Sequence, residues 1–141
     1  MNATQANAEF AREFQKKIPF VGHLGIEVES IGDGEASLSI QLQPELTNSF
    51  GSAHGGVILS IVDVALCTAA RSQHPDSIGV ITIDLSLQFI GAGLGKLTAH
   101  ARVLKPGRNT VFTECEVRNE DGSLVAKAIG TVRVRVAGKK D

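Results

Sequence analysis

Residues 48–70 read NSFGSAHGGVILSIVDVALCTAA, and this stretch decides the fold. A helix is predicted from about residue 55 to about residue 72. It is apolar nearly all round, because its only non-apolar side chains between Gly55 and Ala70 are Ser60, Asp63 and Thr68. A helix without a polar face is surrounded by protein. We therefore predict a buried central helix that carries one carboxylate, Asp63, near its middle.

Period-two alternation on both sides of this helix predicts β-strands. Ile26 and Val28 begin the first strand, and a Gly-Asp-Gly turn at 32–34 leads into a second strand with Ala36, Leu38, Ile40 and Leu42. Four later segments show the same pattern, with apolar or inward positions at Ile81, Ile83, Leu85, Leu87 and Phe89; Leu97, Ala99, Ala101 and Val103; Val111, Thr113, Cys115 and Val117; and Ala126, Ala128, Val132, Val134 and Val136. Breakers separate them at 91–95, 105–108 and 119–123. These four strands are predicted to form an antiparallel meander, giving about six strands in all.

The fold class that follows is α+β. One apolar face of an antiparallel sheet must be covered, and the predicted central helix is the only long candidate. A short N-terminal amphipathic helix at 5–18, with Ala6, Phe10, Phe14 and Ile18 at steps of four, stops before Pro19. Residues 44–51 are expected to form a loop. We predict one domain, residues 1–141, in which a curved antiparallel sheet of about six strands wraps around the central helix.

Composition excludes several classes of function. The chain has 14 basic and 15 acidic residues, so it lacks the broad positive field that nucleic acids or anionic membranes require. No segment is apolar enough to span a membrane, and the N-terminus does not resemble a secretory signal. The two cysteines, Cys67 and Cys115, have no metal-binding or disulfide spacing and are expected to be reduced core residues. We expect a cytoplasmic protein without a metal site.

Asp63 raises the question of what meets its charge. Burying a carboxylate costs several kcal/mol unless donors or cations meet it, and no Lys or Arg lies three or four residues away. Free backbone N–H groups lie at the helix start near His54, but they are about 13.5 Å away along the axis and about half a turn round the helix. The start of a second copy's helix, packed antiparallel, could supply them. We therefore predict a homodimer with two equivalent sites. The alternative is a structural aspartate, exposed by a local gap or bonded to a serine or threonine.

The residues around the helix start suit an oxyanion site. Gly55 and Gly56 lower helix propensity and leave the amides uncovered, which suits the charge that develops on a carbonyl oxygen during acyl transfer. His54 could point into the site or order the loop. Asn48 could orient water or a carbonyl, or be an ordinary turn residue. A flexible loop exit would also explain the glycines.

The pattern Asn48-x-x-Gly51-x-x-His54-Gly55-Gly56, followed by Asp63-x-Ala65, resembles the hot-dog-fold acyl-CoA thioesterases of the phenylacetyl-CoA thioesterase (PaaI-like) type. The segments GVITIDLSLQFIGA (79–92) and VLKPGRN (103–109) are also similar to that family. The resemblance implies a long helix wrapped by an antiparallel sheet, dimers whose sheets join edge to edge, and often a tetramer of two dimers.

The resemblance also implies roles for individual residues. Asp63 takes the acidic position, as general base or nucleophile, and Gly55 supplies the oxyanion amide. Asn48 and His54 match residues that shape and polarise the carbonyl site. Thr82 falls where similar proteins place a serine or threonine that assists water, although alternation puts it on the polar side of its strand, away from Ile81 and Ile83; selection for β propensity is the alternative explanation.

The leading hypothesis is hydrolysis of an acyl-CoA thioester, with no cofactor beyond the coenzyme A of the substrate. Gly56 is a further candidate contact with the substrate, and Arg71, Lys105 and Arg108 are candidate contacts with the coenzyme A phosphates, or else simple solvated charges. The alternatives are an acyl-CoA dehydratase or hydratase on the same fold and a non-catalytic acyl-CoA binder. Composition does not choose between aromatic and aliphatic acyl groups.

Overall fold

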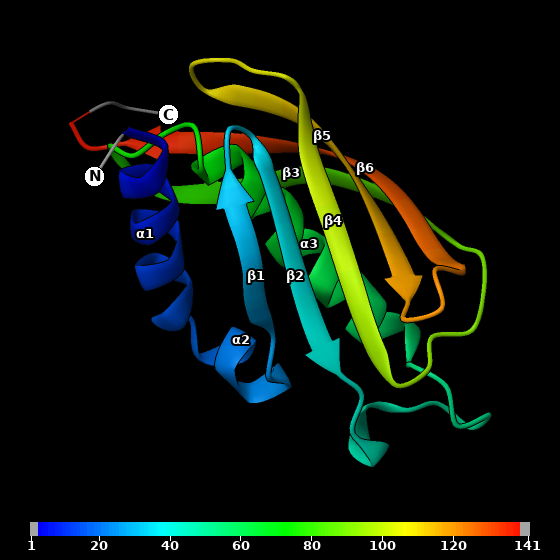
Figure 1. Cartoon of the computed structure of the whole chain (residues 1–141). Coiled ribbons are helices and arrows are strands. Elements are labelled where there is room, and N and C mark those ends of the chain that lie inside the picture. Colours follow the sequence, from blue (N-terminus) through cyan, green and yellow to red (C-terminus); the bar gives the residue numbers. More distant parts are fainter. Residues whose placement is uncertain (1–2, 139–141) are drawn as a thin grey trace.

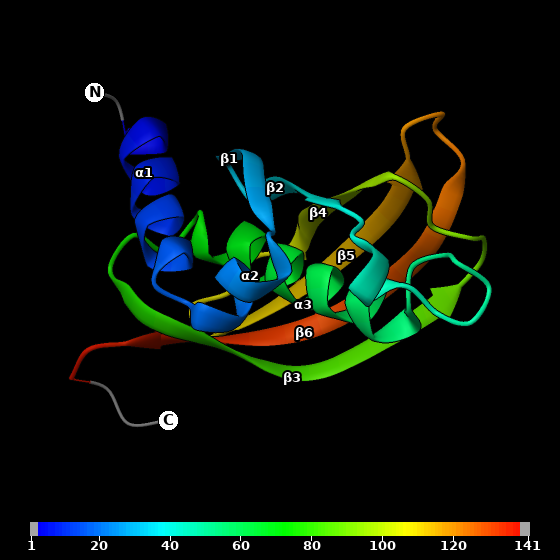
Figure 2. The same cartoon turned by 90° about the horizontal axis from the view of Figure 1, so that it is seen from below.

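One long helix, α3 (Gly55–Arg71), crosses the concave face of a curved antiparallel sheet in the computed structural model, which describes residues 3–138 (Figures 1 and 2). The described residues form six strands in the order β1-β2-β4-β5-β6-β3. Their bounds are β1 Glu27–Gly32, β2 Glu35–Gln41, β3 Ser77–Phe89, β4 Lys96–Lys105, β5 Thr110–Asn119 and β6 Leu124–Val136. The expected hot-dog architecture is confirmed.

The core lies between α3 and the concave face of the sheet. Ile61, Val62, Ala65, Leu66, Ala69 and Ala70 of α3 have no exposed surface. Most inward positions predicted for β2, β4 and β5 are buried with them, including Leu38, Leu97 and Val117, whereas Leu42 and Val103 are partly buried. Burying a leucine or valine side chain stabilises the folded state by about 1.5–3 kcal/mol, so this contact anchors the helix against the sheet.

The predicted meander of the last four strands is wrong in one place. β3 pairs with β6 rather than with β4, and β4 pairs with β2 on its other side. The chain leaves β2, crosses the sheet in α3 and returns at the far edge as β3 (Figure 2). Alternation of apolar and polar residues identifies a strand but not its neighbours, which is why the pattern did not predict this order.

The prediction for the faces of β3 is also wrong, because this strand contains a β-bulge. Thr82 pairs with Val132 and Asp84 pairs with Thr131, so Ile83 is an extra residue between two consecutive pairs. An extra residue reverses the face on which the following side chains lie. Val80 and Thr82 therefore face α3 before the bulge, and Leu85 and Leu87 pack against the core after it. Ile81, Ile83 and Phe89 are exposed, at 42%, 59% and 59%.

Two helices precede the sheet instead of the predicted single helix at 5–18. α1 (Ala3–Lys16) ends two residues earlier, and α2 (Pro19–Leu24) begins at Pro19. Proline is favoured at the first position of a helix because its fixed φ suits the helix and its missing N–H is not needed there. The side chains of Ala6 and Phe10 lie outside what the structure describes.

The segment 44–51, expected to be a loop, contains a short 3₁₀ turn, Pro44–Leu46. Among the residues described, no helix has both the length and the hydropathy needed to cross a membrane.

Candidate active site

Asp63 lies in the middle of α3, on a face of the helix that is covered only in part, with β3 at one side of it. The side chains of Ser60, Asp63, Val64 and Cys67 are only partly buried, and Leu59 is 43% exposed. These positions recur at three- and four-residue steps, so they share one face of the helix. The prediction that α3 is covered on all sides therefore does not hold within one chain. One face with Asp63 in it remains open.

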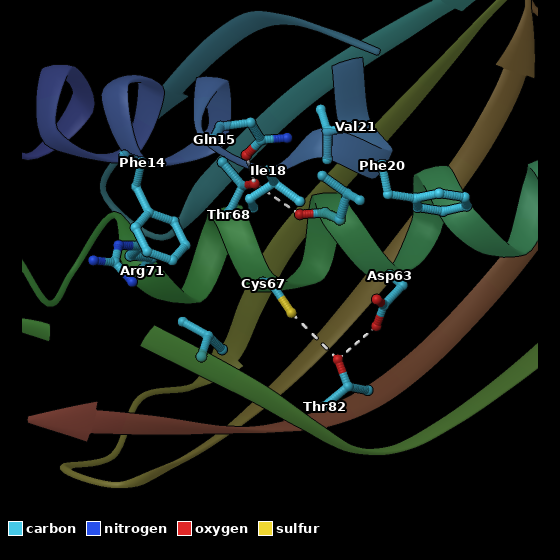
Figure 3. A pocket seen from close by; sticks show the side chains of 13 residues that line it. Phe14, Gln15, Ile18, Phe20, Val21, Asp63, Cys67, Thr68, Arg71 and Thr82 are labelled. Atoms are coloured by element: carbon cyan, nitrogen blue, oxygen red, sulfur yellow. Dashed lines mark hydrogen bonds between the residues drawn. The ribbon is translucent and has the colours of Figure 1, made fainter. Parts of the chain in front are cut away.

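Thr82 holds the Asp63 carboxylate from the neighbouring strand. Its hydroxyl donates a hydrogen bond to Asp63 Oδ1 at 2.5 Å, and Cys67 Sγ lies 3.3 Å from the same hydroxyl oxygen (Figure 3). The bulge at Ile83 allows Thr82 to face α3 despite its place in an apparently polar row. The expectation that Thr82 points away from the core face is thus wrong, and the structure brings Thr82 and Asp63 together.

A pocket of about 380 Å³ adjoins Asp63 between α1, α2, α3 and β3 (Figure 3). Apart from Asp63, Thr82 and Cys67, its lining is mostly apolar, with Ala11, Phe14, Ile18, Phe20, Val21, Val64 and Val80. The Thr68 hydroxyl contacts Gln15 Oε1 at 2.6 Å and so ties α1 to α3. The sequence pattern predicted an amphipathic first helix that contains Phe14. It did not show that Phe14 and Phe20 wall a pocket beside Asp63.

Arg71 also lines this pocket, but it is not the solvent-facing charge expected at the helix end. The side chain is 3% exposed, its guanidinium lies 3.6 Å from the centroid of the Phe14 ring, and Nη2 donates to the Ser77 carbonyl at 2.6 Å. Burial lowers the pKa of Arg71 below its usual value. Arg71 is placed to fix α1 against the end of α3 rather than to meet phosphates at the surface.

The start of α3 is organised by His54. Nδ1 of His54 accepts a hydrogen bond from the Gly56 amide at 2.9 Å, which makes His54 the N-cap of the helix. In the described part of the chain no hydrogen bond uses the Gly55 amide. A Cβ on Gly55 would lie 3.3 Å from the Phe89 ring, and one on Gly56 would lie 3.1 Å from His54 Nδ1. Close packing within the chain therefore accounts for both glycines, and Gly55 keeps a free donor.

Asn48 is occupied by its own loop. Its Oδ1 accepts hydrogen bonds from the amides of Phe50 and Ser52 at 2.9 and 3.2 Å, and its Nδ2 contacts Ser52 Oγ at 3.0 Å. These bonds hold the loop that leads to Ala53 and the helix start. The structure thus places Asn48 and His54 in supporting positions around Gly55.

Lys105 and Arg108 lie in and beside the exposed turn between β4 and β5, and neither lines the pocket at Asp63. The two cysteines are free thiols. Burial raises the pKa of both Cys67 and Cys115 to about 12, so each stays protonated at neutral pH. Within residues 3–138 no group of three or more His, Cys, Asp or Glu side chains could hold a metal ion.

Comparison with known proteins identifies the family of this chain. The model of the thioesterase superfamily matches residues 50–126, which include Gly55, Asp63 and Thr82. The medium/long-chain acyl-CoA thioesterase YigI of Salmonella typhimurium is 29% identical, with 95% of this chain and 97% of YigI covered.

Two solved structures show the same architecture. The conserved protein PA5202 of Pseudomonas aeruginosa has a TM-score of 0.80 and 32% identity, covering 86% of this chain and 97% of that one. The PaaI protein from the phenylacetic acid degradation operon of Escherichia coli has a TM-score of 0.88 and covers 98% of this chain and 99% of that one; at 24% identity it supports the fold alone. The fold and these matches place the chain in a class of enzymes that hydrolyse thioesters. The chain belongs to the thioesterase superfamily.

Proposed function

We propose that the protein hydrolyses acyl-CoA thioesters to a free acid and coenzyme A. The observation that carries the proposal is the position of Asp63, a carboxylate anchored by Thr82 at one end of an otherwise mostly apolar pocket. Such a pocket suits an acyl chain, and in this proposal the thioester that ends the chain lies beside the Asp63 carboxylate. The acyl-CoA thioesterases among the relatives support the same reaction.

The proposed site combines two chains. Asp63 and the free Gly55 amide are separated by eight residues of one helix, about 12 Å, so one chain cannot bring both to a single carbonyl group. The open face of α3 around Leu59 and Asp63 offers a surface for a second copy. The outer edge of β3, which pairs only with β6 in the described chain, offers another. A two-fold pair would place Asp63 of one protomer near Gly55 of its partner. The tetramer expected from the resemblance would join two such pairs.

In the proposed reaction the thioester carbonyl oxygen accepts a hydrogen bond from the Gly55 amide, at the positive end of the helix dipole. Asp63 takes a proton from water as the water oxygen bonds to the carbonyl carbon; alternatively, the carboxylate attacks that carbon directly, and water later hydrolyses the resulting acyl anhydride to free acid and Asp63. The carbon–sulfur bond then breaks, and coenzyme A leaves as a thiol after protonation. Asn48 and His54 hold the loop and helix start that present Gly55.

Replacement of Asp63 tests the proposal. Asp63→Asn keeps the size of the side chain and can still accept from Thr82, so the fold and oligomer should persist while kcat falls by about 10²-fold or more. Free thiol release from a panel of acyl-CoA esters measures the effect, with Ser37→Ala on the outer face of the sheet as a control that should keep wild-type activity. Undiminished hydrolysis by Asp63→Asn would contradict the proposed role.

A further inference from the structure

The Cys67 thiol, the Thr82 hydroxyl and the Asp63 carboxylate form one hydrogen-bonded chain (Figure 3). Cys67 follows Asp63 by four residues in α3, so both side chains lie on the same face and reach the same strand. The sulfur lies 3.3 Å from Thr82 Oγ1, and that oxygen lies 2.5 Å from Asp63 Oδ1. Neither the sequence motif nor the proposed reaction uses Cys67.

The direction of the two hydrogen bonds follows from counting protons. A threonine hydroxyl has one proton to donate, and an ionised carboxylate only accepts. Thr82 therefore gives its proton to Asp63, and its oxygen can only accept from Cys67. Burial raises the pKa of the Cys67 thiol to about 12, so the thiol keeps the proton that this arrangement needs. The chain runs from the S–H of Cys67 to the O–H of Thr82 to Asp63.

We infer that Cys67 is a positioning residue, whose thiol fixes the Thr82 hydroxyl as a donor to Asp63. The oxygen of the Thr82 hydroxyl accepts from the thiol, and its O–H donates to Oδ1 of Asp63. Both hydrogen bonds would be lost if the hydroxyl rotated towards water. Oδ1 is thereby anchored, and Oδ2 remains for the reactants. Thr82 then orients the carboxylate instead of assisting water directly. This inference rests on the proposed thioesterase function.

Two substitutions at Cys67 separate positioning from packing. Cys67→Ala removes the donor, and we expect kcat to fall about 3- to 10-fold with an unchanged KM, the size expected for one net hydrogen bond. Cys67→Ser keeps a donor and should recover most of the loss. A role in packing alone would make the two variants alike. In a Thr82→Val background, Cys67→Ala should change kcat less than 2-fold, because the partner hydroxyl is already gone.

Infrared spectroscopy tests the contact without relying on activity. In a Cys115→Ala background the S–H stretching band belongs to Cys67 alone, since the sequence contains two cysteines. A thiol that donates absorbs at a lower frequency than a free thiol, and Thr82→Val should shift the band upwards. An unshifted band would overturn the inference, and this comparison remains available if Cys67→Ala does not fold.

The kinetic outcomes distinguish the two proposals. Wild-type protein that releases no thiol from any acyl-CoA ester overturns the proposed function, and the reaction role of Cys67 with it. An active wild type whose kcat is unaffected by Cys67→Ala overturns the inference alone. The inference is also overturned if the fold-loss in kcat of the double variant equals the product of the two single losses. The substitutions at Cys67 and Thr82 would then act independently.

Discussion

The Gly56 amide donates a 2.9 Å hydrogen bond to Nδ1 of His54, so the imidazole caps the helix whose first turn it precedes. The family pattern places a polarising histidine here, whereas the structure shows a ring nitrogen already engaged. The cap satisfies the Gly56 amide and leaves the Gly55 amide as the free donor at the helix start. In the described residues, His54 therefore leaves the Gly55 amide, and not the Gly56 amide, available to a ligand.

Substitution of His54 should separate capping from direct chemistry. His54→Ala removes the cap and should lower the free energy of unfolding by about 1 kcal/mol. His54→Asn supplies another capping oxygen, and we expect it to restore stability and to keep kcat within about 3-fold of wild type. Thermal melts and thiol-release kinetics on both variants check this. A stable His54→Asn enzyme with a large loss of kcat would show that the imidazole itself acts on the carbonyl.

The central helix and most inward strand positions could be predicted because burial leaves a direct mark on sequence. Asp63 could also be singled out, since one carboxylate within an apolar helix demands a partner. The bulge at Ile83 could not be predicted, because residues 81–89 alternate without interruption while their side chains change face at one residue. The contact between Thr82 and Asp63 depends on that bulge.

Arg71 shows a second limit of sequence reasoning. A basic residue in the last turn of a helix is ordinarily solvated and favourable to the helix dipole. Here α1 packs over the end of α3 and places Phe14 against the guanidinium, which buries it. This packing joins residues more than fifty positions apart, and no local pattern in either segment indicates it. The pocket walls contributed by α1 and α2 were missed for the same reason.

Lys105 and Arg108 remain candidates for the coenzyme A phosphates, although they do not line the pocket. If they meet the phosphates, Lys105→Glu combined with Arg108→Glu should raise KM for an acyl-CoA about 10-fold and leave KM for the matching acyl-pantetheine unchanged, because only the former carries the nucleotide phosphates. Raising the salt concentration should weaken the preference of the wild-type protein for acyl-CoA over acyl-pantetheine. The control is Lys127→Glu. Lys127 lies near the start of β6, and the β5–β6 turn is at the end of the sheet opposite to the β4–β5 turn (Figure 1). Equal effects on both substrates would exclude phosphate binding.

The Cys67 and Cys115 thiols predict a loss of stability at alkaline pH. Burial raises the pKa of Cys67 and Cys115 from the usual 9.0 to about 12, so between these values the folded state holds protons that the unfolded state has released. Their stabilising contribution is complete below pH 9 and falls by about 1.4 kcal/mol per pH unit for each thiol as pH rises towards 12. Denaturant unfolding at several pH values measures how steeply the free energy of unfolding falls with pH. Cys115→Ala should make this dependence shallower. An identical slope in that variant would contradict the assignment.

A site shared between two chains makes a prediction about mixed dimers. Gly55→Pro removes the amide proton, and proline suits the first helical position. The preceding His54 has φ −62° and ψ 140°, an extended conformation that a following proline permits. Gly55→Ala is the matched control, because it adds the same Cβ near Phe89 and keeps the amide. We expect Gly55→Pro alone to lose most activity and Gly55→Ala to keep more.

Inactive Gly55→Pro and inactive Asp63→Asn chains should complement each other when they are co-expressed with different tags and purified as a mixed dimer. One site then combines an intact Asp63 with an intact Gly55, and the other contains both changes, so about half of the wild-type kcat per dimer should return. A site formed within one chain would leave both sites defective, because each chain carries one lesion. A mixed dimer as inactive as its parents would therefore contradict the pairing of Asp63 with its partner's helix start.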